Sequence, residues 1–223
     1  MNTDYIARME NLLRLYALPY DARYPVVCFD ERPCFLIGEL VEGLAPQPGQ
    51  VAKEHYAYSK HGSCVVLAAT EALTGQRLMR VYSQRTQKEY TAFMQELAAL
   101  YPKAVKIQLV QDNLNTHKPN SFYNQLSADE AFTLSHRFDW HYTPKSASWL
   151  NMIEIEFSAL GRQCLNRRIP SQIELEKQVL AWAKERNQQA IKISWQFTVS
   201  QARETLNSKY VKVNTLNEKY KKT

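Results

Sequence analysis

The chain has 223 residues, of which 45% are hydrophobic and 22% charged, and its formal net charge is +6. No run approaches the roughly 18 apolar residues of a membrane span, and the N-terminus lacks a signal-peptide core, which predicts a cytoplasmic protein. The positive charge is compatible with a polyanionic partner. The four cysteines show neither a CxxC pair nor zinc spacing, so we expect free, buried thiols rather than a metal site.

The first forty residues predict one helix and two short strands. Residues 4–16 repeat apolar side chains at the spacing of an amphipathic helix. A strand-type run then covers 25–30 and ends in an acid, Asp30. A second such run covers 34–40.

Residues 42–63 differ in composition from the segments on either side. Glycines and prolines break any regular pattern there, so we expect an exposed excursion between two hairpin strands. Strand patterns follow at 63–72 and 77–82, separated by a turn that contains Gly75. These consecutive runs predict antiparallel strands.

Strands and helices alternate in the middle of the chain. Thr86 with Glu89 three residues later is a capping-box pattern, which predicts the start of a helix that ends at Pro102. A strand follows over 106–112, and its last residue is again an acid, Asp112. Three shorter elements come next: a helix from about residue 120, a helix over 128–135 and a strand over 138–142. Strands first, then strands alternating with helices, predict an α/β fold with a mixed sheet.

The stretch 141–157, HYTPKSASWLNMIEIEF, carries a third acid of interest. A helical pattern starts near Trp149, and its apolar stripe is formed by Leu150, Ile153, Phe157 and Leu160. Asn151 and Glu154 lie on a second stripe of that predicted helix, and Glu154 is about 100° from Ile153. A carboxylate in this position can point into a cleft while the helix beside it is anchored in the core.

The C-terminal part is predicted to be helical. A start at Pro170 and Ser171 predicts a helix to about residue 189. A last helix is predicted from Thr198 to about Tyr210, and the tail that follows is basic.

Three acids, Asp30, Asp112 and Glu154, are candidates for a common site. Asp30 and Asp112 close two apolar strands, and the carboxyl ends of strands commonly carry function in open α/β sheets. Three oxygen ligands from distant segments suit a hard divalent cation such as Mg²⁺, and pairs of such ions catalyse phosphoryl transfer. Each acid alone also has an ordinary interpretation, as a turn residue, an Asx-turn residue or a solvated helix residue.

The sequence blocks around these acids carry a family resemblance. They are VVCFDE at 26–31, LVQDNLNTHKP at 109–119 and HYTPKSASWLNMIEIEF at 141–157. With these blocks the chain resembles a DDE transposase of the mariner-like superfamily, nearest to the bacterial insertion-sequence-630 branch. The resemblance extends to RTQKEY at 85–90, CLNRRIP at 164–170, WAKERN at 182–187 and WQFT at 195–198, and thus covers nearly the whole chain.

The resemblance implies a ribonuclease-H-like catalytic core that cuts and rejoins DNA through two divalent metal ions, Mg²⁺ or Mn²⁺. Its mixed five-stranded sheet would be flanked by helices, with the first three strands antiparallel. Carried over residue by residue, Asp30, Asp112 and Glu154 are the catalytic and metal-binding triad. The implied organisation is a linker helix in 1–24, the DDE catalytic core in 25–198 with the excursion 42–63, and a C-terminal helix with a basic tail in 199–223.

Further residues near the triad are candidates for supporting the metal site or contacting DNA: Glu31, Asn113, His117, Lys145 and Asn151. Glu31, Asn113 and His117 match motif positions beside the triad, and the alternative for them is turn structure. Lys145 either meets a phosphate or is a solvated loop lysine.

Two groups of basic residues are DNA-binding candidates. The first lies in the predicted excursion and consists of Lys53, His55 and Lys60. Basic residues interleaved with tyrosines suit a nucleic-acid backbone and unstacked bases, and the alternative is an ordinary surface hairpin. The second group follows the predicted catalytic helix and consists of Arg162, Arg167 and Arg168. These arginines either line a DNA groove or compensate the dipole of the helix C-terminus.

The resemblance covers the catalytic half of such a transposase, whose full-length members carry helix-turn-helix modules before the core. We therefore expect transposon-end and target DNA as partners, a homodimer, and a helix-turn-helix part supplied by a longer or frameshifted product. A bacterial, nucleoid-associated location follows from the same resemblance. Two alternatives stay open: a catalytically idle or decayed fragment that binds DNA or dimerises, and a ribonuclease-H-type nuclease for RNA–DNA hybrids.

Overall fold

The computed structural model describes residues 1–40, 57–113 and 118–221. Its centre is a mixed five-stranded sheet in the order β3-β2-β1-β4-β5. The strands are β1 (Val26–Glu39), β2 (Tyr58–Glu71), β3 (Gln76–Tyr82), β4 (Ile107–Gln111) and β5 (Phe138–Tyr142). The first three strands are antiparallel, and β4 and β5 continue the sheet in parallel with β1. The predicted α/β fold with this strand arrangement is confirmed.

The predicted strands at 25–30 and 34–40 are one continuous strand, β1, so the prediction of two short strands was wrong. Pro33 interrupts the apolar pattern but pairs with Val65 of β2 inside the ladder. The parallel pairing with β4 involves only Val26–Cys28. Beyond that point one side of β1 is an edge, where a proline needs no ladder partner for its missing N–H group.

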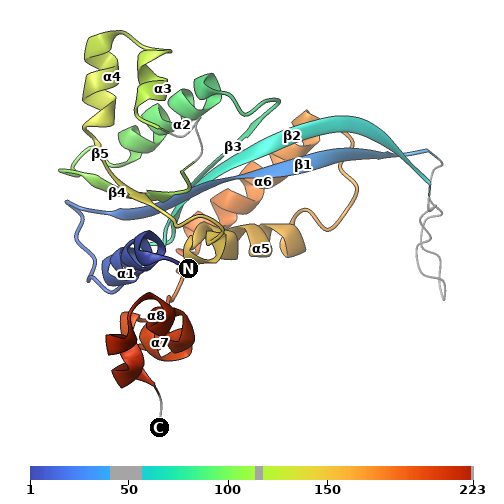
Figure 1. Ribbon diagram of the computed structural model, residues 1–223. Helices are drawn as coiled ribbons and strands as arrows, with labels where there is room; N and C mark the ends of the chain where they lie inside the picture. The colour runs from blue at the N-terminus through green and yellow to red at the C-terminus, as the bar shows by residue number, and fades with distance from the viewer. Residues whose placement is uncertain (41–56, 114–117, 222–223) are drawn as a thin grey trace.

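Strand β2 begins at Tyr58, before the predicted start at Ser63. Residues 58–62 therefore belong to a hairpin arm with the end of β1 rather than to the predicted excursion. A register shift between Phe35 and Ile37 marks an irregularity in this arm, and Gly62 on the opposite strand has φ +103°. The extra residue and the positive φ are typical of a β-bulge. The arm projects from the body of the molecule (Figure 1).

Helices cover both faces of the sheet (Figure 1). One face carries α2 (Gln87–Leu100), α3 (Asn120–Tyr123) and α4 (Ala128–Ser135). The other face carries α1 (Thr3–Tyr16), α5 (Ile153–Gln163) and α6 (Gln172–Gln188). Successive residues of a strand point to opposite faces. Accordingly Cys28 belongs to the core under α1 and α5, whereas Phe29 belongs to the core under α2.

Local sequence signals set several helix starts. The predicted capping box of Thr86 with Glu89 opens α2, and an equivalent pair, Ser127 with Glu130, opens α4. In each box the N-terminal hydroxyl and the carboxylate satisfy backbone N–H groups that the helix itself leaves without partners. The four cysteines are buried free thiols, as predicted.

The predicted last helix is two helices, α7 (Val199–Thr205) and α8 (Asn207–Val213), followed by the short 3-10 helix η2 (Thr215–Tyr220). The break falls just before Asn207, a residue type that favours helix ends because its side chain competes for backbone hydrogen bonds. The Asn207 amide donates to the carbonyl of Asn217, which ties α8 to η2. No helix in the described part of the chain is long and apolar enough to cross a membrane.

Candidate active site

The parallel register of β1 and β4 brings Asp30 and Asp112 together. The paired residues run up to Cys28 opposite Val110. Asp30 and Asp112 each follow two residues after this last pair, so they lie just beyond the end of the ladder. Cys28 and Val110 both belong to the core under α1 and α5, so by strand alternation the two aspartates face the same side of the sheet. Both acids line one cavity of about 600 Å³.

The cavity forms where the β1–β4 ladder ends and polar loops take over. Its other walls come from the segment after β4, the loop 143–148 before α5, and the start of α1. Ser146 of that loop has φ 60°, in the left-handed region that a non-glycine side chain disfavours. The N–H of Ala147 donates to the carbonyl of Pro144 (3.1 Å) and closes the turn. This turn presents exposed Lys145 at the cavity.

Asn151 joins the start of α5 to β1 beside Asp30. Its buried amide nitrogen donates to the Phe29 carbonyl (2.8 Å), and its amide oxygen accepts from the N–H of Ile153 (3.4 Å). Asn151 is extended, with φ −88° and ψ 113°, between a 3-10 turn at Ser148–Leu150 and the first residue of α5. The prediction of one helix from Trp149, with Asn151 and Glu154 on a common stripe, was therefore wrong. Tertiary hydrogen bonds of Asn151 override local helix propensity here.

Glu154 is half-buried in the first turn of α5, and its N–H donates to the Asn151 carbonyl (3.1 Å). It is not among the residues that line the cavity with Asp30 and Asp112. Within the described residues, no three His, Cys, Asp or Glu side chains come together as a metal-binding group. The two aspartates nevertheless present the carboxylate oxygens that Mg²⁺ and Mn²⁺ prefer. The structure thus brings two of the three predicted acids to one cavity and anchors the helix of the third beside it.

Comparison with family models decides the family. Residues 25–176 match the model of the DDE superfamily endonuclease. The chain belongs to this family. Among curated proteins, the sequence comparison finds no match.

Solved structures similar to this chain include complexes of the Mos1 mariner transposase. The Mos1 paired-end complex with Mn superposes with a TM-score of 0.56 at 14% identity, covering 86% of this chain and 59% of that one. The Mos1 strand transfer complex superposes with a TM-score of 0.55 at 15% identity, covering 84% of this chain and 56% of that one. The chain thus spans less than two thirds of these neighbours. At this identity the likeness shows the fold, which is the ribonuclease-H-like fold of Mos1.

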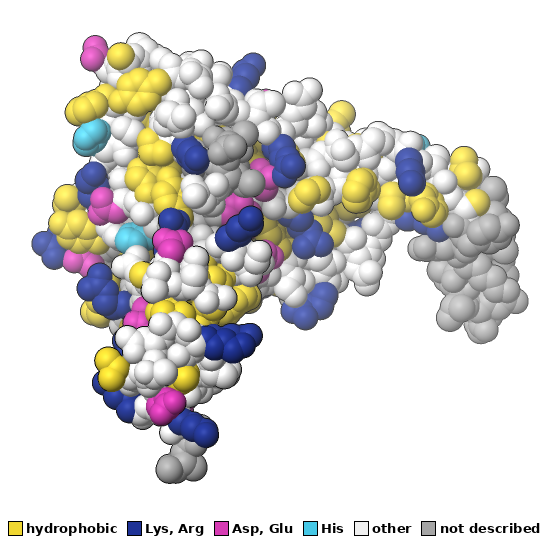
Figure 2. Space-filling view, viewed as in Figure 1, with side chains coloured by type: hydrophobic (Ala, Val, Ile, Leu, Met, Phe, Trp, Pro, Cys, Tyr) yellow, Lys and Arg dark blue, Asp and Glu magenta, His cyan; other side chains and the backbone are white. Residues whose placement is uncertain are grey.

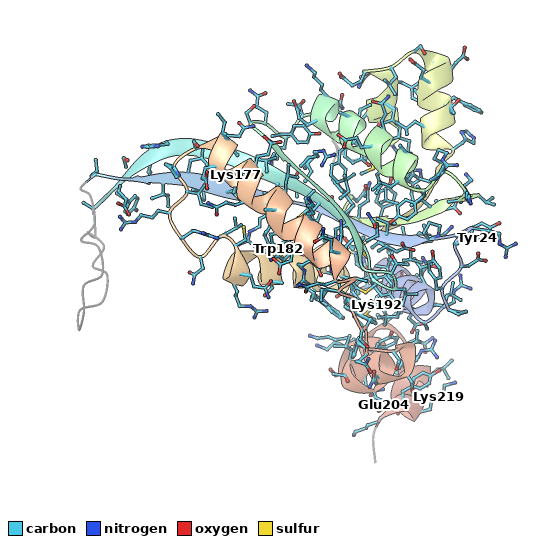
Figure 3. All side chains as sticks on the ribbon, turned by 180° about the vertical axis from the view of Figure 1, so that it is seen from behind. Tyr24, Lys177, Trp182, Lys192, Glu204 and Lys219 are labelled. Atoms are coloured by element: carbon cyan, nitrogen blue, oxygen red, sulfur yellow. The ribbon has the colours of Figure 1, made fainter. Side chains whose placement is uncertain are left out.

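Glu156, the neighbouring carboxylate of α5, has a different environment from Glu154. Both it and Arg77 of β3 are fully buried, and Arg77 Nε and Nη2 donate to its two carboxylate oxygens at 2.7 and 2.9 Å. Arg186 of α6 adds two hydrogen bonds at 3.2 and 3.0 Å. Burial alone would raise the pKa of Glu156, but the hydrogen bonds from Arg77 and Arg186 outweigh it and hold the pKa below its ordinary value. Figure 3 shows α6 lying along this side of the sheet, with Trp182 turned toward α5.

The other motif residues of this chain are spread over both faces. Asn113 and Lys145 are exposed and line the cavity. Glu31 points to the opposite face from Asp30, where it forms an ion pair with Arg85. His117 lies outside the described residues.

Of the predicted DNA-binding residues, those that lie in the described part of the chain are not part of the cavity wall. Arg162, Arg167 and Lys60 are exposed, and Arg168 Nη1 donates to the Ala57 carbonyl (3.4 Å) beside the hairpin arm. Lys53 and His55 lie outside the described residues. On the face in Figure 2, acidic side chains lie near the middle with Lys and Arg side chains around them.

Two cavity residues, Asp4 and Arg8 of α1, were not predicted from the sequence. Their four-residue spacing forms an ion pair (3.0 Å), which in a sequence looks like any solvated helix face. The position of α1 against the cavity depends on tertiary packing. No local signal separates this pair from the other charged residues of the helix.

Proposed function

We propose that this chain is the catalytic domain of a transposase that performs metal-dependent DNA strand cleavage and strand transfer during DNA transposition. The observation that supports the proposal is that Asp30 and Asp112, just beyond the end of the parallel β1–β4 ladder, line one cavity. Membership in the DDE superfamily endonuclease family supports the same chemistry. The Mos1 neighbours were solved in complexes with Mn and with Mg, which supports divalent metal use.

Asp30, Asp112 and Glu154 would hold two divalent ions, Mg²⁺ or Mn²⁺. When bound, such ions activate the attacking oxygen and stabilise the leaving oxygen of phosphoryl transfer. Two further residues would position the third acid and bind the substrate. Asn151 fixes the start of α5 against the Phe29 carbonyl, and so holds Glu154 beside the cavity. Lys145 faces the cavity as a cation and would neutralise a backbone phosphate.

The partners follow from the same proposal. Transposon-end and target DNA are the substrates, as the Mos1 paired-end and strand transfer complexes suggest for this fold. We also propose that the active form is a homodimer, that residues 25–198 form the catalytic core, and that a helix-turn-helix part recognises the transposon ends. The insertion-sequence-630 branch is the proposed subgroup.

Glu154→Gln is expected to abolish metal-dependent cleavage without unfolding the chain, because a neutral amide replaces an anionic metal ligand at a half-buried position. The assay is nicking of supercoiled plasmid with Mg²⁺ or Mn²⁺, against the same reaction with EDTA. Glu185→Gln, the same change at an exposed position on α6, is the matched control and should retain full activity. Full activity of Glu154→Gln would remove this residue from the triad.

A second function is favoured by one observation, namely that no group of three acids is assembled among the described residues. A fragment that binds DNA without cleaving it would show salt-dependent binding and no metal-dependent product. The plasmid assay therefore separates the two functions. Comparing cleavage of the DNA plasmid with cleavage of an RNA–DNA hybrid distinguishes a transposase from a ribonuclease-H-type nuclease, which would cleave the hybrid and spare the duplex DNA.

A further inference from the structure

Helix α1 forms one wall of the acid-lined cavity, although it lies outside residues 25–176 that match the family model. Asp4 and Arg8 line the cavity together with Asp30 and Asp112. A second hollow of about 320 Å³ separates the first turn of α1 from Lys145 and its neighbours in the loop. The two hollows therefore agree that α1 faces the proposed active site.

Helix α1 is held in this position by contacts on its buried face and on the face of Asp4 and Arg8. Met9, Leu12 and Leu13 are at most 1% exposed and belong to the core shared with α5. On the side of Asp4 and Arg8, the Asn11 amide lies 3.2 Å from His141 Nδ1 of β5. These contacts fix α1 against the sheet, so Arg8 has a defined place in the cavity wall.

The cavity carries two kinds of charge. Asp30 and Asp112 suit a divalent cation, whereas Arg8 and Lys145 suit a phosphate. Arg8 Nε donates to Asp4 Oδ1 (3.0 Å), and its side chain is 37% exposed. This contact occupies Nε, and the two terminal nitrogens of a guanidinium can still bind phosphate oxygens in a bidentate manner.

We propose that Arg8 binds a DNA backbone phosphate at the mouth of the active-site cavity, with Asp4 orienting its guanidinium. The proposal rests on the proposed function in taking DNA as the substrate. It makes α1 part of the substrate-binding surface.

The test is the salt dependence of DNA binding, measured with a short duplex by fluorescence anisotropy in EDTA. The slope of log K against log salt is negative, and its magnitude decreases by about 0.9 for each lost phosphate contact on duplex DNA. Arg8→Gln is therefore expected to reduce the slope by about that amount. Equivalently, its deficit in affinity relative to wild type shrinks about 3.5-fold between about 50 and about 200 mM salt. Asp4→Asn keeps an oxygen acceptor for Arg8 but removes a negative charge, so it should strengthen binding.

Arg23→Gln is the matched control, because Arg23 also pairs with a nearby aspartate, Asp21 (2.8 Å), but does not line the cavity. It should keep the wild-type slope, and thermal melting should show that all variants are folded. An unchanged slope for Arg8→Gln, an equal loss in Arg23→Gln, or no duplex binding by the wild-type chain would each overturn the inference. Because binding needs no cleavage, a wild-type chain that binds DNA but gives no metal-dependent product would refute the proposed catalysis and leave Arg8 to be decided by the slope.

Discussion

Asp112→Asn is expected to lower the rate of metal-dependent DNA cleavage by on the order of 10³-fold or more. Asp112 follows the end of β4 and lines the same cavity as Asp30, just beyond the last β1–β4 pair. Losing an anionic ligand removes several kcal/mol of the charge stabilisation that a metal provides, and each 1.36 kcal/mol is about tenfold in rate. The measurement is the initial rate of plasmid nicking in Mg²⁺ and in Mn²⁺.

Asp139→Asn is the matched control for this change. Asp139 lies on β5, accepts a hydrogen bond from Gln108 (2.7 Å) and does not line the cavity. Its amide replacement can accept the same hydrogen bond, so nicking should remain at the wild-type rate. Wild-type activity of Asp112→Asn would show that the cavity between β1 and β4 is not the catalytic centre.

Glu156→Gln is expected to destabilise the fold by about 3–5 kcal/mol, because it leaves the buried Arg77 guanidinium without a counter-charge. Arg186 loses the same partner. In a chain of this size the loss corresponds to a fall in melting temperature of about 6–20 °C. The free energy of unfolding can be measured by urea denaturation.

The lowered pKa of Glu156 also predicts how the stability difference between wild type and Glu156→Gln changes with pH. The pKa of folded Glu156 lies below its ordinary value, so its carboxylate stabilises the fold above the pKa of the unfolded chain. This contribution is lost as the pH falls through the folded pKa. The difference in stability between wild type and Glu156→Gln should therefore be full at neutral pH and shrink below about pH 4.3. A difference that stays constant down to acid pH would contradict the role of this ion pair.

Exposed Glu185 again provides the control, since Glu185→Gln should change stability little. Below its melting temperature, Glu156→Gln should still cleave DNA, because Glu156 does not line the cavity. The two glutamates of α5 are then separable by assay: Glu154 by activity and Glu156 by stability.

The sequence by itself determined the features that depend on residues close together in the chain. The capping boxes at Thr86 and Ser127 join residues three apart, and both open helices in the structure. The apolar runs of β3, β4 and β5 likewise identify their own strands, because side-chain alternation and burial leave a local pattern. The sequence blocks around Asp30 and Asp112 also predicted the family that the match over 25–176 shows.

Only the tertiary structure decided which distant residues meet. The continuation of β1 through Pro33 depends on pairing with β2, and the break at Asn151 depends on the carbonyl of Phe29. Arg77 of β3 and Glu156 of α5 pair across two elements of the fold, and Arg8 reaches the cavity because the buried side of α1 sets its orientation. In each case the energy comes from a partner far away in the chain, which leaves no periodic signal in the sequence. The acids were therefore visible as candidates, but the cavity that Asp30 and Asp112 share, and the helix that forms its wall, required the folded chain.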